Sequence, residues 1–380
     1  MNVLHICSFY PSSNLYINLF NELYKKGVKN SVYIPCKPKV ITESNNCIKD
    51  SSKLIYAPIC KNGDSICEKM ANIFHQYTFC NYNTVVYKNF KKLKEVEKCD
   101  IIHAHSLFND GYLAYKLHRE TGKEYIVAVR NTDVNGYFKI AKHLRKLGIE
   151  IMKSSKKIIF ISYSYKELVL NNYVSKKDLK EIQEKSLVIP NGIDEFWLNN
   201  GLIKPKNINK DKIRLIQVGK VDKNKNVNTT IKICEELRNQ GINTKLFVVG
   251  DGKLLNKLKL QSKNKNYIEF KGKANKEELK KLYDESDIFI MPSQFETFGL
   301  VYVEAMTRGL PIIYTRGQGI DQYFEDGVVG FPIAYNDYNE GVKSVKKIML
   351  NYESISTNGL TNSKSFSWKL IANQYIDIYQ

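Results

Sequence analysis

Long hydrophobic runs are absent from this chain of 380 residues. No segment has the roughly 18 uninterrupted apolar residues that a membrane-spanning helix needs, and the chain starts without a basic leader. We therefore expect a soluble, cytoplasmic protein that is not secreted. Proline is scarce, with 9 residues, and 43% of the chain is hydrophobic, which excludes disordered and collagen-like chains and predicts a packed fold.

Metal, redox and dinucleotide motifs are also missing. None of the 8 cysteines forms a Cys-x-x-Cys pair, so we expect free thiols. No Asp-x-Asp or histidine-cluster pattern indicates a divalent metal site, and we expect neither a metal ion nor a cofactor. No Gly-x-Gly-x-x-Gly follows the first predicted strand, which argues against a nicotinamide dehydrogenase.

Acidic side chains are too few to balance the basic ones, and the net charge is +19. Residues 1–190 carry 30 basic and 17 acidic side chains, whereas residues 191–380 carry 28 and 22. The excess in the first half favours an anionic partner there. A solvated, merely lysine-rich surface is the alternative, because AT-rich coding produces the same bias. No nucleic-acid-binding module is recognisable, so we expect no nucleic acid partner.

Short apolar strands alternate with helical segments along most of the chain. The first strand is followed by a turn and by a helical pattern from Leu15 to Leu23 that closes at Gly27. Strands that are apolar on both faces are typical of a parallel sheet covered by helices on both sides. The predicted strands are 3–7, 31–35, 100–104, 125–129, 157–161 and 187–189 in the first half, and 213–218, 245–249, 267–270, 288–291 and 311–314 in the second.

A polar segment at 195–212 interrupts this rhythm and is the predicted linker. We therefore predict an α/β protein with two Rossmann-like, doubly wound domains, an N-terminal domain at 1–194 and a C-terminal domain at 213–362. Open α/β sheets bind ligands outside the carboxyl ends of their strands. We accordingly expect the two domains to face a shared interdomain cleft that holds the active site.

Glycines and lysines follow the predicted strands of the second half. Gly219, Lys220 and Lys225 lie between a strand and a helix, where close backbone approach, positive charge and the helix dipole suit a diphosphate. Gly250 and Gly272 follow two other strands, so their backbone is also expected to approach a ligand. A lysine-rich loop and ordinary turns are the alternatives.

Two carboxylates, Glu296 and Glu304, lie in the most specific segment of the sequence. Glu296 stands in a loop after a predicted strand, and Glu304 lies inside the helix that starts near Gly299. Carboxylates accept hydrogen bonds from hydroxyl groups, and the free N–H groups of a helix start can hold ligand oxygens. A nucleotide sugar would satisfy the lysines, the helix dipole and the carboxylates together.

These residues resemble the family 4 glycosyltransferases of the GT-B fold. Residues 188–194 are similar to the segment that ends the family's first domain, 218–220 with Lys225 to its phosphate motif, and Glu296 to Glu304 to its E-x7-E motif. The last residues, 363–380, look like the family's terminal helix, which crosses back onto the first domain. The resemblance implies a retaining, metal-independent transferase that uses a nucleoside-diphosphate sugar.

The resemblance also implies individual roles. Lys220 and Lys225 would neutralise the donor diphosphate, although the family usually has Arg where Lys220 stands, so that a point charge replaces a bidentate fork. Glu296 would hold the transferred sugar and Glu304 the ribose hydroxyls. The donor contacts are expected from Gly219, Gly250, Gly272, Thr297, Phe298, Gly299, Leu300 and Glu304.

In the first half the resemblance is thinner. His105 ends the strand–histidine pattern at 100–106 and is expected to lie against the reacting sugar, whereas His103 is expected to be a packed structural histidine. The opening loop at 8–12 departs from the family's Gly-rich version. Arg130 and Asp133 follow another strand and are expected to bind the acceptor, with a simple capped turn as the alternative.

A basic amphipathic pattern runs through 140–157, with Ile140, Leu144, Leu147 and Ile151 on one stripe. It fits either a core-facing helix or one that rests on an anionic membrane. Relatives of this kind extend surface polysaccharides on lipid carriers, so the expected function is sugar transfer to a saccharide or lipid-linked acceptor, with the enzyme peripheral on the inner membrane face. A nucleotide-sugar epimerase and a non-enzymatic polyanion-binding protein are the alternatives.

Overall fold

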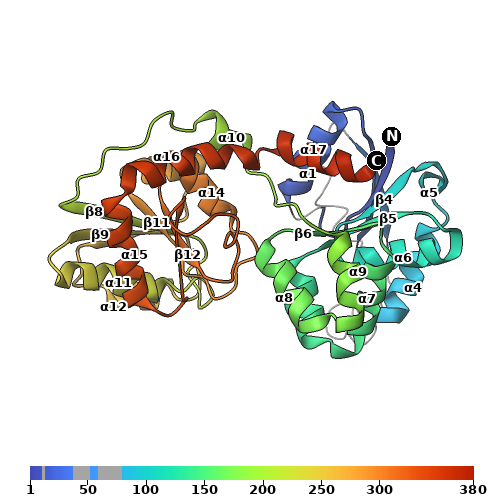
Figure 1. Cartoon of the computed structure of the whole chain (residues 1–380), viewed down its shortest axis with the longest axis horizontal. Coiled ribbons are helices and arrows are strands. Elements are labelled where there is room, and N and C mark those ends of the chain that lie inside the picture. The colour runs from blue at the N-terminus through green and yellow to red at the C-terminus, as the bar shows by residue number, and fades with distance from the viewer. Residues whose placement is uncertain (11–12, 37–51, 59–78) are drawn as a thin grey trace. The chain divides into compact units, whose positions relative to one another are not determined.

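The computed structural model describes residues 1–10, 13–36, 52–58 and 79–380, which divide into two compact units (Figure 1). The first unit comprises Met1–Ile161, Tyr165–Pro190 and Trp368–Gln380. The second comprises Ser162–Ser164 and Asn191–Ser367. The sequence placed the boundary near residue 194 and a linker after it. In the structure the residues of this linker belong to the second unit, and they include a helical turn, α10 (Glu195–Asn199).

The first unit is built on a parallel sheet with strand order β3-β2-β1-β4-β5-β6-β7. Its central strands are buried along their whole length, as the double-sided apolar pattern predicts. The strands are β1 (Asn2–Ile6), β2 (Lys29–Cys36), β3 (Ser52–Pro58), β4 (Ile101–Ala104), β5 (Tyr125–Val129), β6 (Lys157–Phe160) and β7 (Ser186–Val188). The sequence analysis missed β3, an edge strand that pairs only with β2 among the described strands.

Helices cover both faces of this sheet. α1 (Asn14–Lys25) and α17 (Trp368–Tyr379) pack together in one core cluster. The opposite cluster contains residues of α4 (Phe79–Phe90), α6 (Asn109–Thr121), α7 (Arg145–Ser154), α8 (Tyr163–Tyr173) and α9 (Lys176–Lys185). Shorter elements are α5 (Lys94–Lys98), the π-helical η2 (Thr132–Phe138) and the 3-10 turn η3 (Lys142–Leu144).

The basic amphipathic segment proves to be a core-facing helix. Leu144 and Ile151 are buried in the core of the first unit, and Leu147 packs against it. Only Ile140, which precedes η3, is well exposed, at 64%. Most of the apolar stripe is therefore buried in the core of the first unit. Among the described residues no helix is long and apolar enough to cross a membrane.

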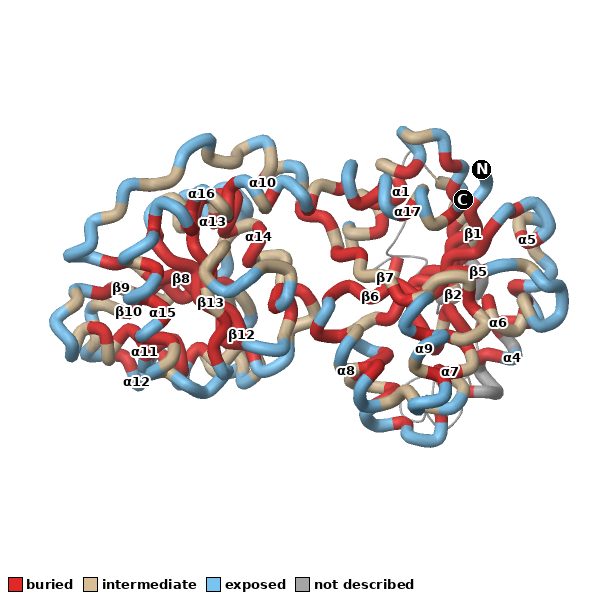
Figure 2. The backbone as a smooth tube through the Cα atoms, viewed as in Figure 1, coloured by how far each residue is buried: buried red, intermediate tan, exposed pale blue. Residues whose placement is uncertain are grey.

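The second unit repeats the architecture, with strand order β10-β9-β8-β11-β12-β13. Its strands are β8 (Lys212–Val218), β9 (Asn243–Val249), β10 (Ile268–Gly272), β11 (Ile288–Ile290), β12 (Ile312–Thr315) and β13 (Gly330–Ile333). Its other helices are α11 (Val227–Asn239), α12 (Leu255–Gln261), α13 (Lys276–Glu285), α14 (Leu300–Thr307), α15 (Tyr338–Leu350), α16 (Tyr352–Ser363) and η4 (Lys364–Phe366). In both units the central strands are red in Figure 2, the colour of buried residues.

The sequence analysis also missed β13, and its composition explains why. Gly330 and Pro332 both weaken strand propensity, and Pro is tolerated only at a sheet edge, where β13 lies. Gly330 is needed there because a Cβ atom would come within 1.7 Å of the Ile312 carbonyl oxygen. The predicted fold class is nevertheless confirmed: both sheets are parallel and doubly wound, as in Rossmann-like domains.

Candidate active site

The strand order of each unit reverses at one point. In the second unit it reverses between β8 and β11, and in the first between β1 and β4. Open α/β sheets bind ligands outside the carboxyl ends of the strands at such points. In the second unit, the loop after β8 begins at Gly219 and the loop after β11 contains Glu296. The topology therefore brings the two predicted donor-binding motifs to the same edge of one sheet.

Lys225 and Glu296 form an ion pair between these two loops. Their side chains are 21% and 13% exposed, so both are largely shielded from water. The Lys225 backbone N–H is held by the Asp222 carboxylate at 3.1 Å. Lys220, in contrast, is 67% exposed, and its Nζ lies 3.9 Å from Asp222. Of the two predicted phosphate-binding lysines, Lys225 is the one that lies against a predicted site carboxylate.

The three predicted ligand-approach glycines belong to one backbone network. Gly219 N–H donates to the Val249 carbonyl at 2.9 Å, and Gly250 N–H donates to the Gly272 carbonyl at 2.6 Å. Gly250 has φ +137°, and a Cβ atom there would come within 1.9 Å of the Gly219 carbonyl oxygen. Close packing of backbone on backbone thus requires glycine at 250 without reference to any ligand.

Three residues that the sequence analysis did not select support the Glu296 loop. The Asn224 side chain accepts from Phe295 N–H at 2.9 Å and donates to the Phe295 carbonyl at 3.0 Å. Glu296 N–H donates to Gln318 Oε1 at 3.1 Å, and Gly319 N–H donates to the Glu296 carbonyl at 2.9 Å. Gln318 and Gly319 follow β12, so their place at a strand's carboxyl end was the signal that could have found them.

The residues after Glu296 differ in which of their groups are accessible to a ligand. Phe298 is 2% exposed and packs its ring against Tyr323 and Phe366, so only its backbone is available to a ligand. Gly299 has φ +84° and precedes α14, where a Cβ atom would come within 2.5 Å of the Tyr302 ring. Thr297 and Leu300 are half-buried.

Glu304, on α14, occupies a different environment from Glu296. Burial raises the pKa of Glu304 to about 7, and the nearby Asp194 adds to the rise. Lys276 and a hydrogen bond from Trp197 act in the opposite direction. Asp194 and Lys276 form an ion pair at 2.5 Å. Glu304 is therefore a carboxyl group that changes charge near neutral pH.

In the first unit, three histidines meet at the reversal point of the sheet. His5 on β1 pairs in register with His103 on β4, and His105 follows β4 directly. His5 Nδ1 lies 3.1 Å from His105 Nε2, and the rings of His103 and His105 stack with centroids 4.0 Å apart. All three are fully buried. His103 is packed, as predicted, and so is the ring of His105.

This cluster is the one group among the described residues that offers three close metal-ligating atoms, all within 4.8 Å of one another. The sequence analysis found no histidine-cluster pattern because His5 lies on another strand, about one hundred residues before its partners. Among the cysteines, the thiols of Cys7, Cys99 and Cys234 are free and buried. Cys47, Cys60 and Cys67 lie outside the described residues.

Arg130 and Asp133 organise the strand ends of the first unit. The buried Asp133 carboxylate accepts backbone N–H groups from Leu107, Phe108 and Arg130 at 2.8 to 3.1 Å. Burial raises the pKa of Asp133 to about 6 against these hydrogen bonds. Arg130 Nε donates to the His105 carbonyl at 3.3 Å. Both residues thus hold the segment after β4 in place.

Asp110, at the start of α6, was also missed. Its Oδ1 accepts from Ser8 Oγ at 2.5 Å and from Ser8 N–H at 3.1 Å, which ties the loop after β1 to α6. Burial raises the pKa of Asp110 to about 7, although the hydrogen bonds with Ser8 and Ser106 oppose the rise. Residues 11–12 of the opening loop lie outside the described residues.

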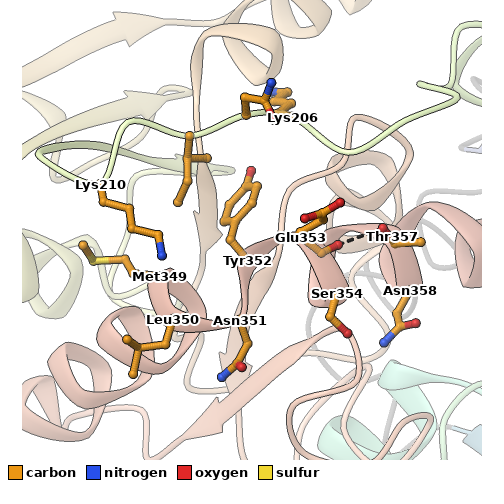
Figure 3. Close-up of a pocket in the computed structure, with 12 residues that line it drawn as sticks. Lys206, Lys210, Met349, Leu350, Asn351, Tyr352, Glu353, Ser354, Thr357 and Asn358 are labelled. Atoms are coloured by element: carbon orange, nitrogen blue, oxygen red, sulfur yellow. Dashed lines mark hydrogen bonds between the residues drawn. The ribbon is translucent and has the colours of Figure 1, made fainter.

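A pocket of about 840 Å³ opens elsewhere on the second unit, between the segment at 206–210 and the junction of α15 and α16 (Figure 3). None of the predicted site residues lines it. Lys206 uses its Nζ to bind the carbonyls of Asp284 and Ser286, at 3.1 and 2.9 Å, near the end of α13, and Tyr352 donates its hydroxyl to the Asp287 carbonyl. These polar groups are engaged within the fold.

The chain is similar in sequence and in structure to known proteins. Residues 200–359 match the model of the family Glycosyl transferases group 1. The alpha-monoglucosyldiacylglycerol synthase of Acholeplasma laidlawii is 26% identical over 315 residues, which cover 76% of this chain and 77% of the synthase.

Solved structures share the fold over the whole chain. The sucrose-phosphate synthase of Thermosynechococcus elongatus has a TM-score of 0.72 at 18% identity, covering 100% of this chain and 98% of that one. Anabaena HepE in complex with UDP-glucose has a TM-score of 0.64 at 14% identity, covering 99% and 98%. The chain has the GT-B fold, and the findings together support its assignment to the group 1 glycosyltransferases and glycosyl transfer as its activity.

Proposed function

We propose that this protein is a retaining, metal-independent glycosyltransferase that moves a sugar from a nucleoside-diphosphate sugar to a hydroxyl group of a saccharide or lipid-linked acceptor. The observation that carries the proposal is the Lys225–Glu296 ion pair at the reversal point of the second sheet. It places a cation suited to a phosphate beside a carboxylate suited to sugar hydroxyls, on the edge where such sheets bind ligands.

When the donor binds, the two residues of this pair would contact different parts of the substrate. Lys225 would turn to the diphosphate and stabilise the charge that develops as it leaves. Glu296 would accept hydrogen bonds from the transferred sugar, and the backbone at 297–300 would add N–H groups from the start of α14. Lys220, which is exposed, would complete the neutralisation, so that lysines and a helix dipole supply the positive charge.

The rest of the nucleotide and the acceptor involve other groups. Glu304 would accept hydrogen bonds from the ribose, and the backbone at Gly219, Gly250 and Gly272 would line the nucleotide. His105 would lie against the reacting sugar. Arg130 and Asp133 would act on the acceptor by positioning the segment after β4, because their side chains already bind backbone groups there.

The resemblance to the family 4 glycosyltransferases implies retention, and the sequence motifs contain no well-placed nucleophile for a covalent intermediate. We expect the acceptor hydroxyl to enter on the face from which the diphosphate leaves, with the leaving phosphate accepting the hydroxyl proton. The name of the Acholeplasma relative supports a lipid acceptor. The basic excess of residues 1–190 would hold the enzyme at the anionic inner face of the cell membrane, where lipid-linked precursors of surface polysaccharides are extended.

The experiment is a screen of nucleotide sugars with saccharide and lipid acceptors, read out by release of nucleoside diphosphate and by NMR of the product's anomeric centre. We expect release from one donor, faster with acceptor, and a product with the donor's anomeric configuration. An inverted linkage would overturn retention, and an isomerised nucleotide sugar without transfer would overturn the transferase assignment.

A pair of variants tests the observation that carries the proposal. Glu296→Ala is expected to abolish most sugar transfer. Glu235→Ala is the matched control, because it breaks another ion pair of the same unit, with Lys265, outside the two loops. Equal transfer by the two variants would remove Glu296 from the site.

A further inference from the structure

A chain of hydrogen bonds leads from Asn30, on β2, through His5 to His105. Asn30 Oδ1 lies 3.0 Å from His5 Nε2, and His5 Nδ1 lies 3.1 Å from His105 Nε2. All three side chains are at least 95% buried, so water does not compete for these bonds. The position of the proton at each link can therefore be deduced from one end of the chain to the other.

The Asn30 end has only one possible orientation. Asn30 Nδ2 lies 3.0 Å from the backbone carbonyl oxygen of Phe20, on α1. A carbonyl oxygen accepts hydrogen bonds and never donates them, so the NH₂ group of Asn30 must face it. The Asn30 oxygen consequently faces His5 and requires a proton on His5 Nε2.

The proton on His5 Nε2 determines the rest. Burial lowers the pKa of His5 to about 3, and burial also holds the pKa of His105 well below its usual value, so both rings are neutral and carry one proton each. His5 Nδ1 then has a lone pair and accepts from His105 Nε2–H. His105 Nδ1 is left with a lone pair, and it has no hydrogen-bond partner among the described residues.

Packing keeps the His105 ring in this orientation. Its face stacks on His103 at 4.0 Å between centroids, and Tyr16 and Phe20 contact it in edge arrangements at 5.2 and 5.5 Å. His103 is held in turn by Tyr379 of α17, with 2.7 Å between Nδ1 and the hydroxyl oxygen. The ring is therefore fixed by neighbours on three elements, and the unpartnered nitrogen keeps one direction.

We propose that His5 and Asn30 are positioning residues that hold His105 in the Nε2–H tautomer and leave its buried Nδ1 as the acceptor nitrogen of the ring. The effect of this tautomer on sugar transfer rests on the proposed function, in which His105 lies against the reacting sugar. The tautomer itself is a property of the folded first unit and can be measured without any substrate.

A bound metal is the competing reading of the same cluster. Three neutral imidazoles, one on β4, one directly after β4 and one on the neighbouring β1, resemble a three-histidine zinc site. Coordination through His105 Nε2 would force the proton onto Nδ1, where it would be a buried donor without a partner among the described residues. The hydrogen-bonded arrangement leaves only an acceptor there and is favoured.

The first experiment is ¹⁵N NMR of the imidazole nitrogens in histidine-labelled protein, assigned with single histidine variants. We expect His5 and His105 to be neutral with protonated Nε2, and His105 Nδ1 to have the shift of an unprotonated nitrogen. Addition of zinc should leave these shifts unchanged. A protonated His105 Nδ1, or stoichiometric zinc that shifts His5, His103 and His105, would overturn the proposal.

The second experiment separates positioning from folding. Asn30→Leu removes both bonds of the amide, whereas Asn30→Asp in its protonated form can still donate to Phe20 and accept from His5. We expect Asn30→Leu to mix the His105 tautomers and lower kcat/KM about tenfold, the equivalent of one lost hydrogen bond. Asn30→Asp should restore the single tautomer and the wild-type kcat/KM. The Kd for the nucleoside diphosphate alone should be the same in both variants as in wild type.

The matched control is Asn83→Leu, because Asn83 is buried in α4 and binds the Phe79 carbonyl at 3.0 Å in the same way, without a hydrogen bond to any histidine of the described residues. It should alter neither the tautomer nor kcat/KM. An Asn30→Leu variant in which His105 keeps the wild-type tautomer would refute the role of Asn30 and His5. If the wild-type protein shows the expected tautomer but no transfer activity, only the proposed function is refuted.

Discussion

Lys225 and Glu296 are 71 residues apart in the sequence and form a largely buried ion pair in the structure. Each belongs to a loop that follows a central strand, and the reversal of strand order between β8 and β11 brings the two loops together. The two charges neutralise each other. In the proposed function a donor that binds to both side chains would replace this pair, which would link phosphate recognition to sugar recognition.

Replacement of Lys225 by alanine is expected to lower turnover by a factor on the order of 10² or more, because a preorganised charge that stabilises the leaving diphosphate would be lost. Steady-state kinetics with the donor found in the screen measures this effect. Lys265→Ala, which breaks the ion pair with Glu235 in the same unit, is the control and should retain normal turnover. Near-normal turnover of Lys225→Ala would remove this lysine from the mechanism.

Glu304 is expected to make nucleotide binding pH-dependent. Its pKa of about 7 means that the carboxylate, the better acceptor for ribose hydroxyls, forms only as the pH rises through neutrality. Affinity for the nucleoside diphosphate should therefore be higher at pH 8 than at pH 6. Glu304→Gln should bind more weakly at pH 8 and lose this dependence, which calorimetric titration at both pH values can measure. A wild-type affinity that is flat over this range contradicts the role.

Asp110 is expected to make folding stability fall as the pH rises. Its folded-state pKa of about 7 lies above the ordinary value of 3.8, so between these values the folded protein binds more protons than the unfolded chain. Its contribution to stability is present below pH 4 and lost as the pH approaches 7. Asp110→Asn mimics the protonated form and should gain on the order of 1 kcal/mol over wild type between pH 5 and pH 8. Urea unfolding of both proteins at pH 5 and pH 8 measures this gain in the free energy of unfolding. A difference between the two proteins that is the same at both pH values would contradict the prediction.

Gly250→Ala is expected to destabilise the second unit by about 1–3 kcal/mol through overpacking, because the new Cβ would lie 1.9 Å from the Gly219 carbonyl oxygen. Gly241→Ala is the control for backbone strain alone: Gly241 has φ +83° but nothing within 4 Å of an added Cβ. Thermal unfolding should therefore show a larger loss for Gly250→Ala. Equal losses would mean that contact with Gly219 is unimportant.

The membrane contact in the proposed function is expected to be electrostatic, because most of the apolar stripe of the predicted amphipathic helix is buried in the core. Sedimentation with anionic liposomes should show binding at low salt that disappears at high salt. Ile140→Ser should bind as wild type does, although Ile140 is the exposed member of the stripe. Binding that persists at high salt would require an apolar anchor, and no binding at low salt would remove the membrane from the proposal.

The sequence was sufficient for the fold class and for the position of Lys225 and Glu296 in the chain relative to the strands, because both depend on local patterns. A strand such as β5 is apolar on both faces because helices cover both sides of its parallel sheet. Lys225 and Glu296 stand just past such strands, so their place at the sheet edge could be predicted from the chain alone. Edge strands were missed, since β13 is paired on only one side and tolerates glycine and proline.

Only the tertiary structure decided which side chains meet and which are already occupied. The Asn30–His5–His105 chain joins two strands and the loop after a third, and no local pattern relates a histidine on the first strand to one about a hundred residues later. Asp133 and the stripe through Ile151 look available in the sequence, yet backbone N–H groups bind the first and the core buries the second. Hydrogen-bond satisfaction and burial depend on neighbours that are distant in the chain, which is why the residue pattern predicted the edge of each sheet but not the contacts made there.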